Sequence, residues 1–371
     1  MCGFCGFTGE VLNREQVLHA MADRITHRGP DSDGYYMDND IAMAFRRLSI
    51  IDLGTGHQPL YNEDKTLVLT FNGEIYNYQD LRRELIAAGH IFTTESDSEV
   101  LLHGFEQWGE ELLPRLRGMF GFAIWNTVDK SLFLARDYFG IKPLHYTQLP
   151  DGRLIYASEI KSILLHPDFV KEFNEKALDN YLSFQYSVPG ETFFKGVYCL
   201  PPAHYAWFRE GRVTEHRYWE STFAPDESMT LDEAVDQIDT AFTNSVEAHR
   251  ISDVEVGCFL SGGVDSSYVA SYFKGQKAFT VGFDNGQHYN ECQFAAELAE
   301  DIGIDHYQHI ITEDEYWDAL PRVQEHLDQP LADPACVALY FVSKLAAEHV
   351  KVVLSGEGAD ELFGGYNIYR D

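Results

Sequence analysis

The sequence predicts two consecutive domains, an α+β domain followed by an α/β domain with a parallel sheet. The 371 residues are enough for two domains of ordinary size, and 45% of them are hydrophobic. The first ~210 residues carry short alternating apolar stretches interrupted by helical patterns, which is typical of α+β layers. From residue 254 onward, continuous apolar strands alternate with helices, which indicates a parallel sheet covered on both faces.

Apolar periodicity locates the elements of the first domain. Strands are expected at 66–72, 121–125, 131–135 and 153–157. Helices are expected at 15–25, 79–88 and 98–108, the last leading on to Leu112. A polar break at 220–229, which contains Pro225, marks a linker. We therefore expect a first domain at 1–215, a linker at 216–229 and a second domain at 230–371.

The second domain is predicted to begin with a helix after Thr230. Its apolar residues fall on one helical face, namely Leu231, Ala234, Val235, Ile238, Phe242 and Val246. Strands then follow at 254–260, 278–283, 306–311 and 351–354, and helices at 266–273, 291–302, 313–326 and 335–348. Ligands of parallel sheets bind at the C-terminal ends of the strands, where Ser261 and Ser355 fall.

Composition excludes several classes of partner. The chain has 28 Lys and Arg against 59 Asp and Glu, a formal net charge of −31, which repels nucleic acid and anionic membranes. No apolar run reaches the ~20 residues that span a bilayer, and the N-terminus lacks the pattern of a signal peptide. Six cysteines are too few for a disulfide scaffold. These features predict a cytoplasmic protein that acts on small molecules.

A glycine turn follows the apolar strand at 254–259. It reads Leu260-Ser261-Gly262-Gly263-Val264-Asp265-Ser266-Ser267. Glycines let the backbone approach a ligand closely, and N–H groups at a helix start attract phosphate. The turn is not a Walker A loop, because no Gly-Lys-[Ser/Thr] closes it. The alternative is an ordinary Gly-Gly-Asp turn between a buried strand and a helix.

The chain opens with Met1-Cys2-Gly3-Phe4-Cys5. Removal of Met1 would leave Cys2 with a free α-amine, whose pKa near 8 suits a general base for the neighbouring thiol. Two other readings are a buried inert cysteine or half of a Cys-x-x-Cys metal site. A zinc cage is disfavoured because the sequence has no second Cys-x-x-Cys.

Further motifs complete a resemblance to known families. The stretches 27–31 (HRGPD), 47–51 (RLSII), 71–77 (FNGEIYN) and 96–99 (SDSE), with Cys2, resemble the class II glutamine amidotransferase domain. The turn at 260–267 resembles the loop of ATP pyrophosphatases, and 355–366 (SGEGADELFGGY) resembles a second signature of the asparagine synthetase family. Essentially the whole chain resembles a glutamine-hydrolysing asparagine synthetase.

The resemblance implies a specific fold for each domain. The first is expected to be a four-layer αββα sandwich of the N-terminal nucleophile hydrolase type. The second is expected to be a doubly wound ATP-pyrophosphatase domain. In the family this domain continues beyond the second signature, with more helices and a basic residue that reaches the ATP phosphates. We therefore expect residues 230–371 to be an incomplete domain.

In the first domain the resemblance assigns Cys2 as nucleophile. Thiolate attack on a glutamine amide builds an oxyanion that needs two donors, and the Asn72 side chain and the Gly73 N–H are expected to supply them. On the residues alone, a type I′ β-turn is the better reading of Asn72-Gly73, and the larger set of motifs favours the donor role. The other glutamine contacts implied are Arg47 for the α-carboxylate, Asp97 for the α-ammonium with the Glu74 backbone nearby, and Ile50 and Ile51.

Two of these assignments have simpler readings. Arg47 and Asp97 could belong to ordinary surface salt bridges of small energetic value. Arg46 could replace Arg47, although the Arg-Leu-Ser-Ile alignment selects Arg47. The stretches 136–144 and 157–161 also resemble the family, and we interpret both as structural.

In the second domain the resemblance implies an ATP and Mg²⁺ site. Glu357 is expected to accept a proton from ammonia as it attacks β-aspartyl-AMP. Asp265 and Asp360 are expected to hold Mg²⁺, since paired carboxylates are common at phosphoryl sites. A glycine-rich turn before an acidic helix start is the simpler reading of 355–361. The ATP contacts implied are Leu260, Ser261, Gly262, Gly263, Asp265, Ser266, Val281, Ser355 and Gly356.

The implied activity is ATP-dependent synthesis of asparagine from aspartate, with ammonia from glutamine. Glutamate, AMP and pyrophosphate are the other products. Amidation of a different carboxylic acid on the same scaffold stays open, as does a non-catalytic regulatory relative. Dimerisation is implied by the resemblance alone.

Overall fold

The computed structural model describes residues 1–186, 190–284 and 291–370. The chain divides into two compact units. The first is Met1–Asp226 with Asp328–Leu331, and the second is Glu227–Leu327 with Ala332–Asp371. Among the described residues, no helix combines the length and the apolar character needed to cross a membrane.

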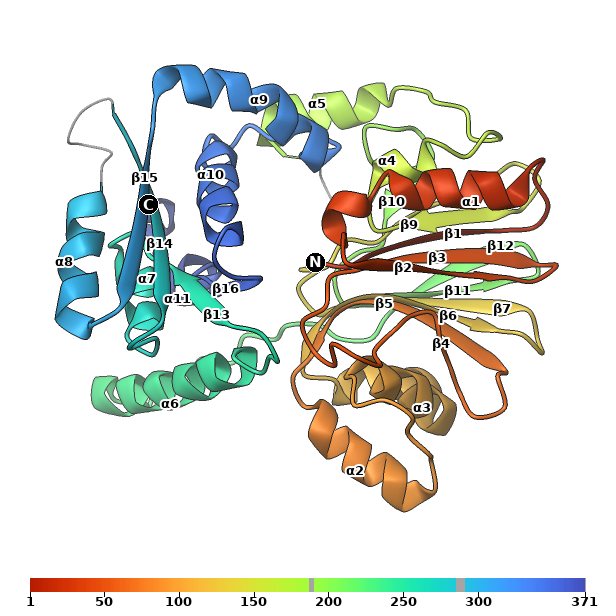
Figure 1. The fold of residues 1–371 in the computed structure, drawn as a ribbon, viewed down its shortest axis with the longest axis horizontal. Helices are drawn as coiled ribbons and strands as arrows, with labels where there is room; N and C mark the ends of the chain where they lie inside the picture. Colours follow the sequence, from red (N-terminus) through yellow and green to blue (C-terminus); the bar gives the residue numbers. More distant parts are fainter. Residues whose placement is uncertain (187–189, 285–290, 371) are drawn as a thin grey trace. The chain divides into compact units, whose positions relative to one another are not determined.

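Two antiparallel sheets form the centre of the first unit (Figure 1). In the described residues, each has six strands. The first sheet has the order β10 (Val197–Cys199), β8 (His145–Gln148), β9 (Leu154–Ala157), β1 (Gly3–Thr8), β3 (Ile41–Arg47) and β2 (Ser32–Met37). The second has the order β12 (Arg212–Arg217), β11 (His204–Arg209), β7 (Ser131–Arg136), β6 (Gly118–Asn126), β5 (Leu67–Ile75) and β4 (Leu60–Tyr61).

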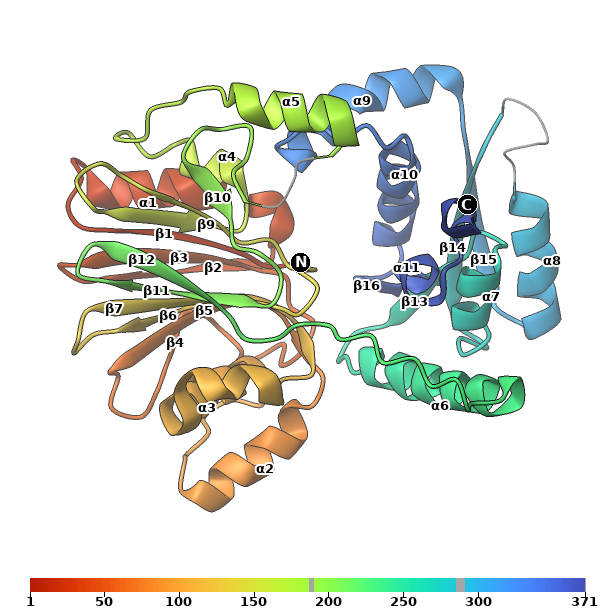
Figure 2. The ribbon, with the colours of Figure 1, turned by 180° about the vertical axis from the view of Figure 1, so that it is seen from behind.

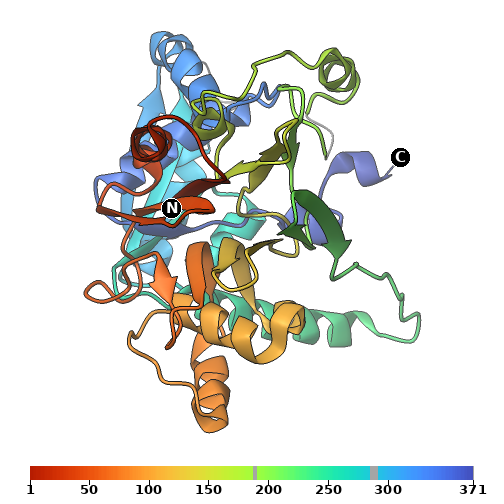
Figure 3. The ribbon, with the colours of Figure 1, turned by 90° about the vertical axis from the view of Figure 1, so that its right-hand side faces the viewer.

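Three apolar clusters hold this unit together. One lies between the two sheets and joins Phe4 and Phe45 of the first to Trp125 of the second. A second packs the other face of the first sheet against helix α1 (Arg14–Asp23) and the short helix α4 (Ile160–Ile163). A third packs the second sheet against helices α2 (Tyr78–Ala88) and α3 (Ser98–Trp108). Figure 3 shows α1 and the α2–α3 pair on opposite sides of the strands.

The elements expected from periodicity in this unit are present. Helix α3 ends at Trp108 and continues as a 3-10 turn over Gly109–Arg115, which contains Pro114. A proline has no N–H to donate, so the α-helical pattern cannot run on through it. Helix α5 (Glu175–Phe184) and a 3-10 turn over Thr26–Arg28 complete the helical segments described here.

Asn72 and Gly73 lie inside strand β5, where they pair with Gly121 and Phe120 of β6. The β-turn reading of Asn72-Gly73 is therefore wrong. The apolar residues on both sides of the pair belong to one nine-residue strand, and β6 supplies a partner along its whole length. Tertiary pairing overrides the local turn preference of Asn-Gly here.

A parallel sheet forms the centre of the second unit. Its four described strands have the order β15 (Asp305–Ile311), β14 (Lys277–Phe283), β13 (Val256–Phe259) and β16 (Val352–Leu354). The helices of this unit are α7 (Val264–Ala270), α8 (Cys292–Ile302), α9 (Glu313–Leu327), α10 (Ala335–Ala347) and α11 (Ala359–Phe363), with a 3-10 turn over Asn367–Arg370 at the end. Figure 2 shows α8 and α10 on opposite sides of β14 and β15.

Alternation along β14 explains how both faces of the sheet are covered. Ala278 packs in a cluster with Ala295 of α8, and the next residue, Phe279, packs with Val342 of α10. Successive strand residues point to opposite faces, so α8 and α10 cover different faces. This arrangement is the one expected from continuous apolar strands separated by helices.

Helix α6 (Leu231–His249) starts at the predicted place. Thr230 and Glu233 form a capping box in which each side chain accepts from the other's backbone N–H. The predicted apolar face is only partly covered by the described residues. Val246 is buried and Phe242 packs against the core, whereas Leu231 is 80% exposed and Val235 56% exposed.

Candidate active site

Cys2 directly precedes the central strand β1 and opens into a cleft of the first unit with an empty volume of about 320 Å³. The cleft brings together seven of the residues expected there, namely Cys2, Arg47, Ile50, Ile51, Gly73, Glu74 and Asp97. Asn72 does not line it, although its neighbours Phe71 and Gly73 do. Segments that are far apart in the sequence therefore meet at one thiol.

The thiol of Cys2 lies against the main chain of Leu48. The Leu48 N–H donates to Sγ at 3.4 Å, and the thiol donates to the Leu48 carbonyl at 3.5 Å. Burial raises the pKa of the Cys2 thiol, against the opposing effects of Leu48 and the terminal amine. Burial also lowers the pKa of the Met1 amine to about 6. The base expected for the thiol is the α-amine that removal of Met1 would leave on Cys2 itself.

Asn72 carries an unpaired donor. Its side chain is 1% exposed, and Nδ2 makes no hydrogen bond in the described structure. A buried polar group without a partner costs free energy and calls for an explanation. An oxyanion formed on a bound substrate would supply the missing acceptor. The donor role of Asn72 stays a prediction, and Nδ2 is free to take it.

Gly73 is required by close packing between β5 and β6. A Cβ at this position would lie 2.2 Å from the carbonyl oxygen of Met119 and 2.6 Å from the ring of Phe71. Any side chain would push the strands apart and move the Asn72–Gly73 segment. The glycine therefore fixes the backbone at the point where the second donor is expected.

Arg47 ends strand β3 and is 5% exposed. Its guanidinium donates to the carbonyl of Asp52 and, at 3.4 Å, to that of Ile51. A Cβ on Gly56 would come within 2.7 Å of its Nη2. The loop 51–56 thus holds the guanidinium at the cleft. The surface salt-bridge reading does not fit a buried arginine bonded to main-chain carbonyls.

Asp97 and Glu74 are two carboxylates that line the same cleft. Asp97 accepts from the N–H of Ile75 at 2.9 Å. Burial raises the pKa of Asp97 to about 6, against the hydrogen bonds from Ile75 and Ser96. Burial and the nearby Asp97 raise the pKa of Glu74 well above its usual value. Two adjacent carboxylates that resist ionisation are stabilised by a cation between them, and an α-ammonium is such a cation.

Two residues near the thiol were not predicted from the sequence. Lys142 is 5% exposed, its ammonium lies 3.2 Å from the Met1 sulfur, and burial lowers its pKa to about 8, although Glu74 opposes this. Gln58 lines the cleft and bonds both the N–H and the carbonyl of Phe71. Lys142 belongs to the stretch 136–144, so the resemblance signalled that stretch without giving its role.

In the second unit the two glycine-rich segments lie against each other. Cys258 of β13 and Leu354 of β16 are register partners, so the loops that follow leave the sheet side by side. A Cβ on Gly356 would lie 2.8 Å from the Cβ of Asp265. Gly262 has φ +84°, a conformation that favours glycine. Ser261 and Ser266 bond each other through their hydroxyls at 2.9 Å.

A large groove beside these loops has an empty volume of about 1130 Å³. It is lined by Ser355, Gly356 and Glu357 together with residues of α6, but not by Ser261, Gly262 or Gly263. Glu357 is exposed there. The two glycine loops of the expected ATP site are therefore in contact at Gly356. Only the loop that follows β16 opens into the groove.

Two of the expected ATP contacts, Leu260 and Val281, pack against the core of the second unit. Leu260 is 1% exposed; its N–H donates to Phe279, and its carbonyl accepts from Thr280. Val281 is half-buried within β14 and packs against the core. In this structure both residues support the loop end of the sheet, and Leu260 offers no free main-chain donor to a ligand.

Two acidic residues follow the glycine loops at the end of the parallel sheet, and both their chemistry and their number are those expected of Mg²⁺ ligands. Asp265 follows Gly263 in the first turn of α7, and Asp360 lies in the first turn of α11. Mg²⁺ is usually held by one or two carboxylates together with substrate phosphates. The contact between Gly356 and Asp265 brings the two glycine loops together, so both carboxylates lie at the same end of the sheet.

Residues 1–219 match the family model described as a glutamine amidotransferase domain, and the chain therefore belongs to this family. Residues 237–371 match the family model described as asparagine synthase.

The chain is also similar to curated proteins. It is 45% identical to the protein of Bacillus subtilis (strain 168) named asparagine synthetase [glutamine-hydrolyzing] 1, over all of this chain and 60% of the relative. It is 40% identical to a putative asparagine synthetase [glutamine-hydrolyzing] of Mycobacterium tuberculosis (strain ATCC 25618 / H37Rv), over all of this chain and 61% of the relative. The chain thus spans about three fifths of the length of these relatives.

One solved structure is similar at 16% identity and a TM-score of 0.46, covering 83% of this chain and 65% of the other. It is described as the allosteric regulatory enzyme of purine biosynthesis.

Proposed function

We propose that this chain is part of a glutamine-hydrolysing asparagine synthetase, with a glutaminase domain at 1–215, a linker at 216–229 and an ATP-dependent synthetase domain from 230. The layered first unit would be of the N-terminal nucleophile hydrolase type. The observation that carries the proposal is the cleft in which Cys2 meets Arg47 and Asp97, next to the unpaired amide of Asn72.

Glutamine would bind with its two ends held by opposite charges. The Arg47 guanidinium would bind the α-carboxylate, and Asp97 with Glu74 would bind the α-ammonium. Ile50 and Ile51 line the cleft and would contact the substrate. These contacts would place the side-chain amide at the Cys2 thiol, which is the orientation that nucleophilic attack requires.

The chemistry of hydrolysis would use the terminal amine as base. It would take the proton of the Cys2 thiol, and the sulfur would attack the amide carbon. Asn72 Nδ2 and the Gly73 N–H would stabilise the oxyanion. Collapse of this species releases ammonia and leaves a thioester, which water hydrolyses to glutamate and free thiol.

The second unit would activate aspartate. Backbone and hydroxyl donors of Ser261, Gly262, Gly263 and Ser266 would hold pyrophosphate at the start of α7, and Ser355 with Gly356 would contact ATP. When bound, Mg²⁺ would neutralise phosphate charge, and Asp265 and Asp360 would hold it. Glu357 would accept a proton from ammonia as it attacks β-aspartyl-AMP, which gives asparagine and AMP.

The test uses the full-length protein with Met1 removal confirmed by mass. Glutamine, aspartate and MgATP are supplied, and asparagine, glutamate, AMP and pyrophosphate are measured together. Appearance of all four products supports the proposal. Glutamate without asparagine or AMP would contradict aspartate as the substrate, because the glutaminase would then serve another acid.

A further inference from the structure

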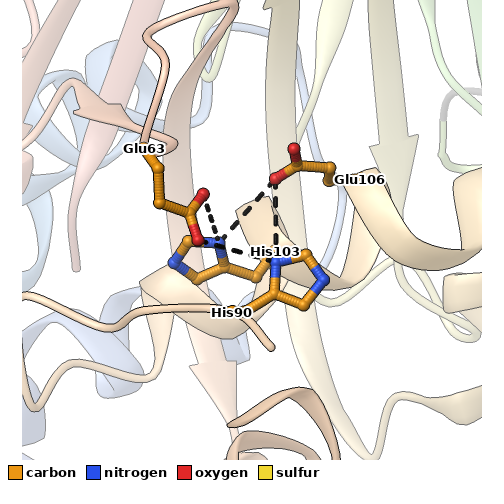
Figure 4. A group of neighbouring side chains, drawn as sticks. All are labelled: Glu63, His90, His103 and Glu106. Carbon is orange, nitrogen blue, oxygen red and sulfur yellow. Dashed lines mark ion pairs between the residues drawn. The ribbon is translucent and has the colours of Figure 1, made fainter. Parts of the chain in front are cut away.

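A cluster of two histidines and two glutamates lies on the first unit, outside the cleft of Cys2. It comprises Glu63, His90, His103 and Glu106, whose nearest ligand atoms all lie within 4.8 Å of one another. Among the described residues, it is the one group of three or more such side chains with this geometry. Figure 4 shows the two imidazoles and two carboxylates turned toward a common centre.

Three separate segments contribute to the cluster. Glu63 lies in the turn between β4 and β5, and His90 follows the C-terminal end of α2. His103 and Glu106 lie one turn apart on α3. Side chains three residues apart on a helix project from the same face, so the pair on α3 can share a ligand.

The distances suit an ion better than direct pairing. His103 Nδ1 is 3.4 Å from Glu63 Oε2 and 3.9 Å from Glu106 Oε2. His90 Nδ1 is 3.8 Å from an oxygen of each glutamate. Charge-assisted hydrogen bonds are shorter, at about 2.7–2.9 Å. Four ligands at about 2.0–2.2 Å from a tetrahedral zinc ion are about 3.3–3.6 Å apart, so small movements would complete the site.

An unpartnered buried nitrogen points to a ligand independently of these distances. His103 is 1% exposed, and its Nδ1 makes no hydrogen bond in the described structure. Its other ring nitrogen, Nε2, lies 3.3 Å from Glu99 Oε1. If Nε2 carries the proton and donates it to Glu99, Nδ1 presents a bare lone pair to the centre of the cluster.

The surrounding contacts are those of metal-binding histidines. Such histidines usually donate their second ring nitrogen to a carboxylate or carbonyl, which fixes the tautomer and the ring orientation. Glu99 does this for His103, and Gln107 Oε1 lies 3.1 Å from His90 Nε2. Glu99 is also held by the main-chain N–H groups of Thr93 and Thr94, at 2.8 Å and 2.7 Å.

Solvent can reach the cluster. Glu63 and Glu106 have side chains 35% and 37% exposed, and with His90 they line an open surface pocket. An ion could therefore enter without unfolding the chain. Two imidazoles with two carboxylates suit Zn²⁺ and similar transition-metal ions, whereas Mg²⁺ and Ca²⁺ prefer oxygen ligands alone.

We propose that Glu63, His90, His103 and Glu106 form a structural binding site for a divalent transition-metal ion, with Zn²⁺ as the natural occupant. The ion would join the β4–β5 turn, the segment after α2 and helix α3. This site is separate from the proposed function, because none of the four residues lines the cleft of Cys2.

The test measures Zn²⁺ binding to untagged full-length protein. After chelation and dialysis, the protein is titrated with Zn²⁺ and the bound metal is measured by mass spectrometry. One ion per chain is expected. Glu106→Gln and His90→Asn should each weaken binding at least about tenfold, since even second-sphere changes cost 10–100-fold. Glu111→Gln and His216→Asn, exposed residues outside the cluster, are the matched controls and should bind as the parent does.

The absorption spectrum of Co²⁺ distinguishes the proposed site from a cysteine site. Visible bands without thiolate charge transfer are expected, and Cys2→Ala should keep both the bands and the stoichiometry. Thiolate charge transfer, or loss of binding in Cys2→Ala, would place the ion at a cysteine and overturn the proposal. Absence of a stoichiometric ion, or equal binding by the Glu106→Gln variant, would overturn it as well.

Discussion

Arg28 Nε donates a hydrogen bond to the carbonyl oxygen of Cys2 at 2.9 Å. Arg28 is itself held by Glu159, whose carboxylate lies 2.8 Å from Nη1. Burial opposes ionisation of Glu159, but His27, Arg28 and Lys161 hold its pKa far below the usual range. The stretches 27–31 and 157–161 thus meet in one buried ion-pair network, which fixes the main chain at the expected nucleophile.

We expect Arg28→Lys to slow glutamine hydrolysis by roughly 10–100-fold through kcat, with KM for glutamine little changed. Lysine keeps the charge but replaces the planar fork, which bonds the Cys2 carbonyl through Nε and Glu159 through Nη1, by a single nitrogen, and misplacement by about 1 Å can cost 10²-fold. Steady-state kinetics measure both constants. Arg46→Lys is the control, since Arg46 bonds Ala22 and Asp23 and makes no bond to Cys2. An unchanged kcat in Arg28→Lys would remove this positioning role.

Asp97→Asn should abolish glutamine binding and yet stabilise the fold at neutral pH. The pKa of Asp97 in the fold is about 6, above the ~3.9 of an unfolded Asp, so ionisation costs stability. This cost is fully present above about pH 6 and vanishes below about pH 4. We expect the free energy of unfolding of Asp97→Asn to exceed that of the parent by roughly 1–3 kcal/mol at pH 7.5 and by almost nothing at pH 4.

Urea unfolding followed by tryptophan fluorescence measures the difference in the free energy of unfolding between Asp97→Asn and the parent. Of the five tryptophans, Trp108, Trp125, Trp207 and Trp219 lie in the first unit, so the signal reports mainly on it. Asp40→Asn, at an exposed carboxylate paired with Lys130, is the control. A variant that is less stable than the parent at pH 7.5 would contradict the strained ionisation of Asp97.

Glutamine hydrolysis should lose efficiency in acid. A protonated Asp97 cannot pair with the α-ammonium, so kcat/KM should fall about tenfold per pH unit once the pH is below about 6. Glu74 shares the cleft, and its raised pKa makes the loss steeper. The measurement is kcat/KM from pH 4.5 to 8. A flat profile down to pH 5 would show that the binding carboxylates are ionised throughout.

Gly262→Ala should impair the second unit alone. Gly262 has φ +84°, and a Cβ would lie 3.0 Å from the Cβ of Phe294. A left-handed conformation costs an ordinary residue about 1–2 kcal/mol, and at Gly262 the added Cβ would also crowd Phe294 and displace the glycine loop, so ATP-dependent pyrophosphate release by the full-length protein should fall roughly tenfold. Gly275→Ala is the control, because φ is +74° there too but no atom lies within 4 Å. Loss of glutamine hydrolysis in Gly262→Ala, or equal effects of both changes, would refute a local role.

The sequence predicted those features that depend on local periodicity. The four strands expected in each unit and helices such as α8 and α10 lie within a few residues of their expected places, whereas the other strands of the first unit were not singled out. Motif residues also converged as expected, because Arg47 and Asp97 reach the cleft of Cys2. These positions are set by strand ends and turns, which leave a pattern in the sequence.

Contacts between distant side chains were not predictable. Arg28 and Glu159 are 131 residues apart, and no periodicity links them. The resemblance marks the stretch 136–144 without singling out Lys142, which lies buried near Cys2. The Asn72-Gly73 turn was a local preference that pairing with β6 overrode. In the metal cluster, only His103 and Glu106 share a helical spacing, whereas Glu63 and His90 come from separate loops.

The most direct test is glutamine hydrolysis by Cys2→Ala beside Cys5→Ala. Cys5 is fully buried in β1 and does not line the cleft, so its variant controls for the loss of a nearby thiol. With Met1 removal confirmed by mass, we expect glutamate release to vanish in Cys2→Ala and to persist in Cys5→Ala. In the full-length protein, Cys2→Ala should still make asparagine from added ammonium. Glutamate release that survives in Cys2→Ala would contradict the assignment of Cys2 as nucleophile.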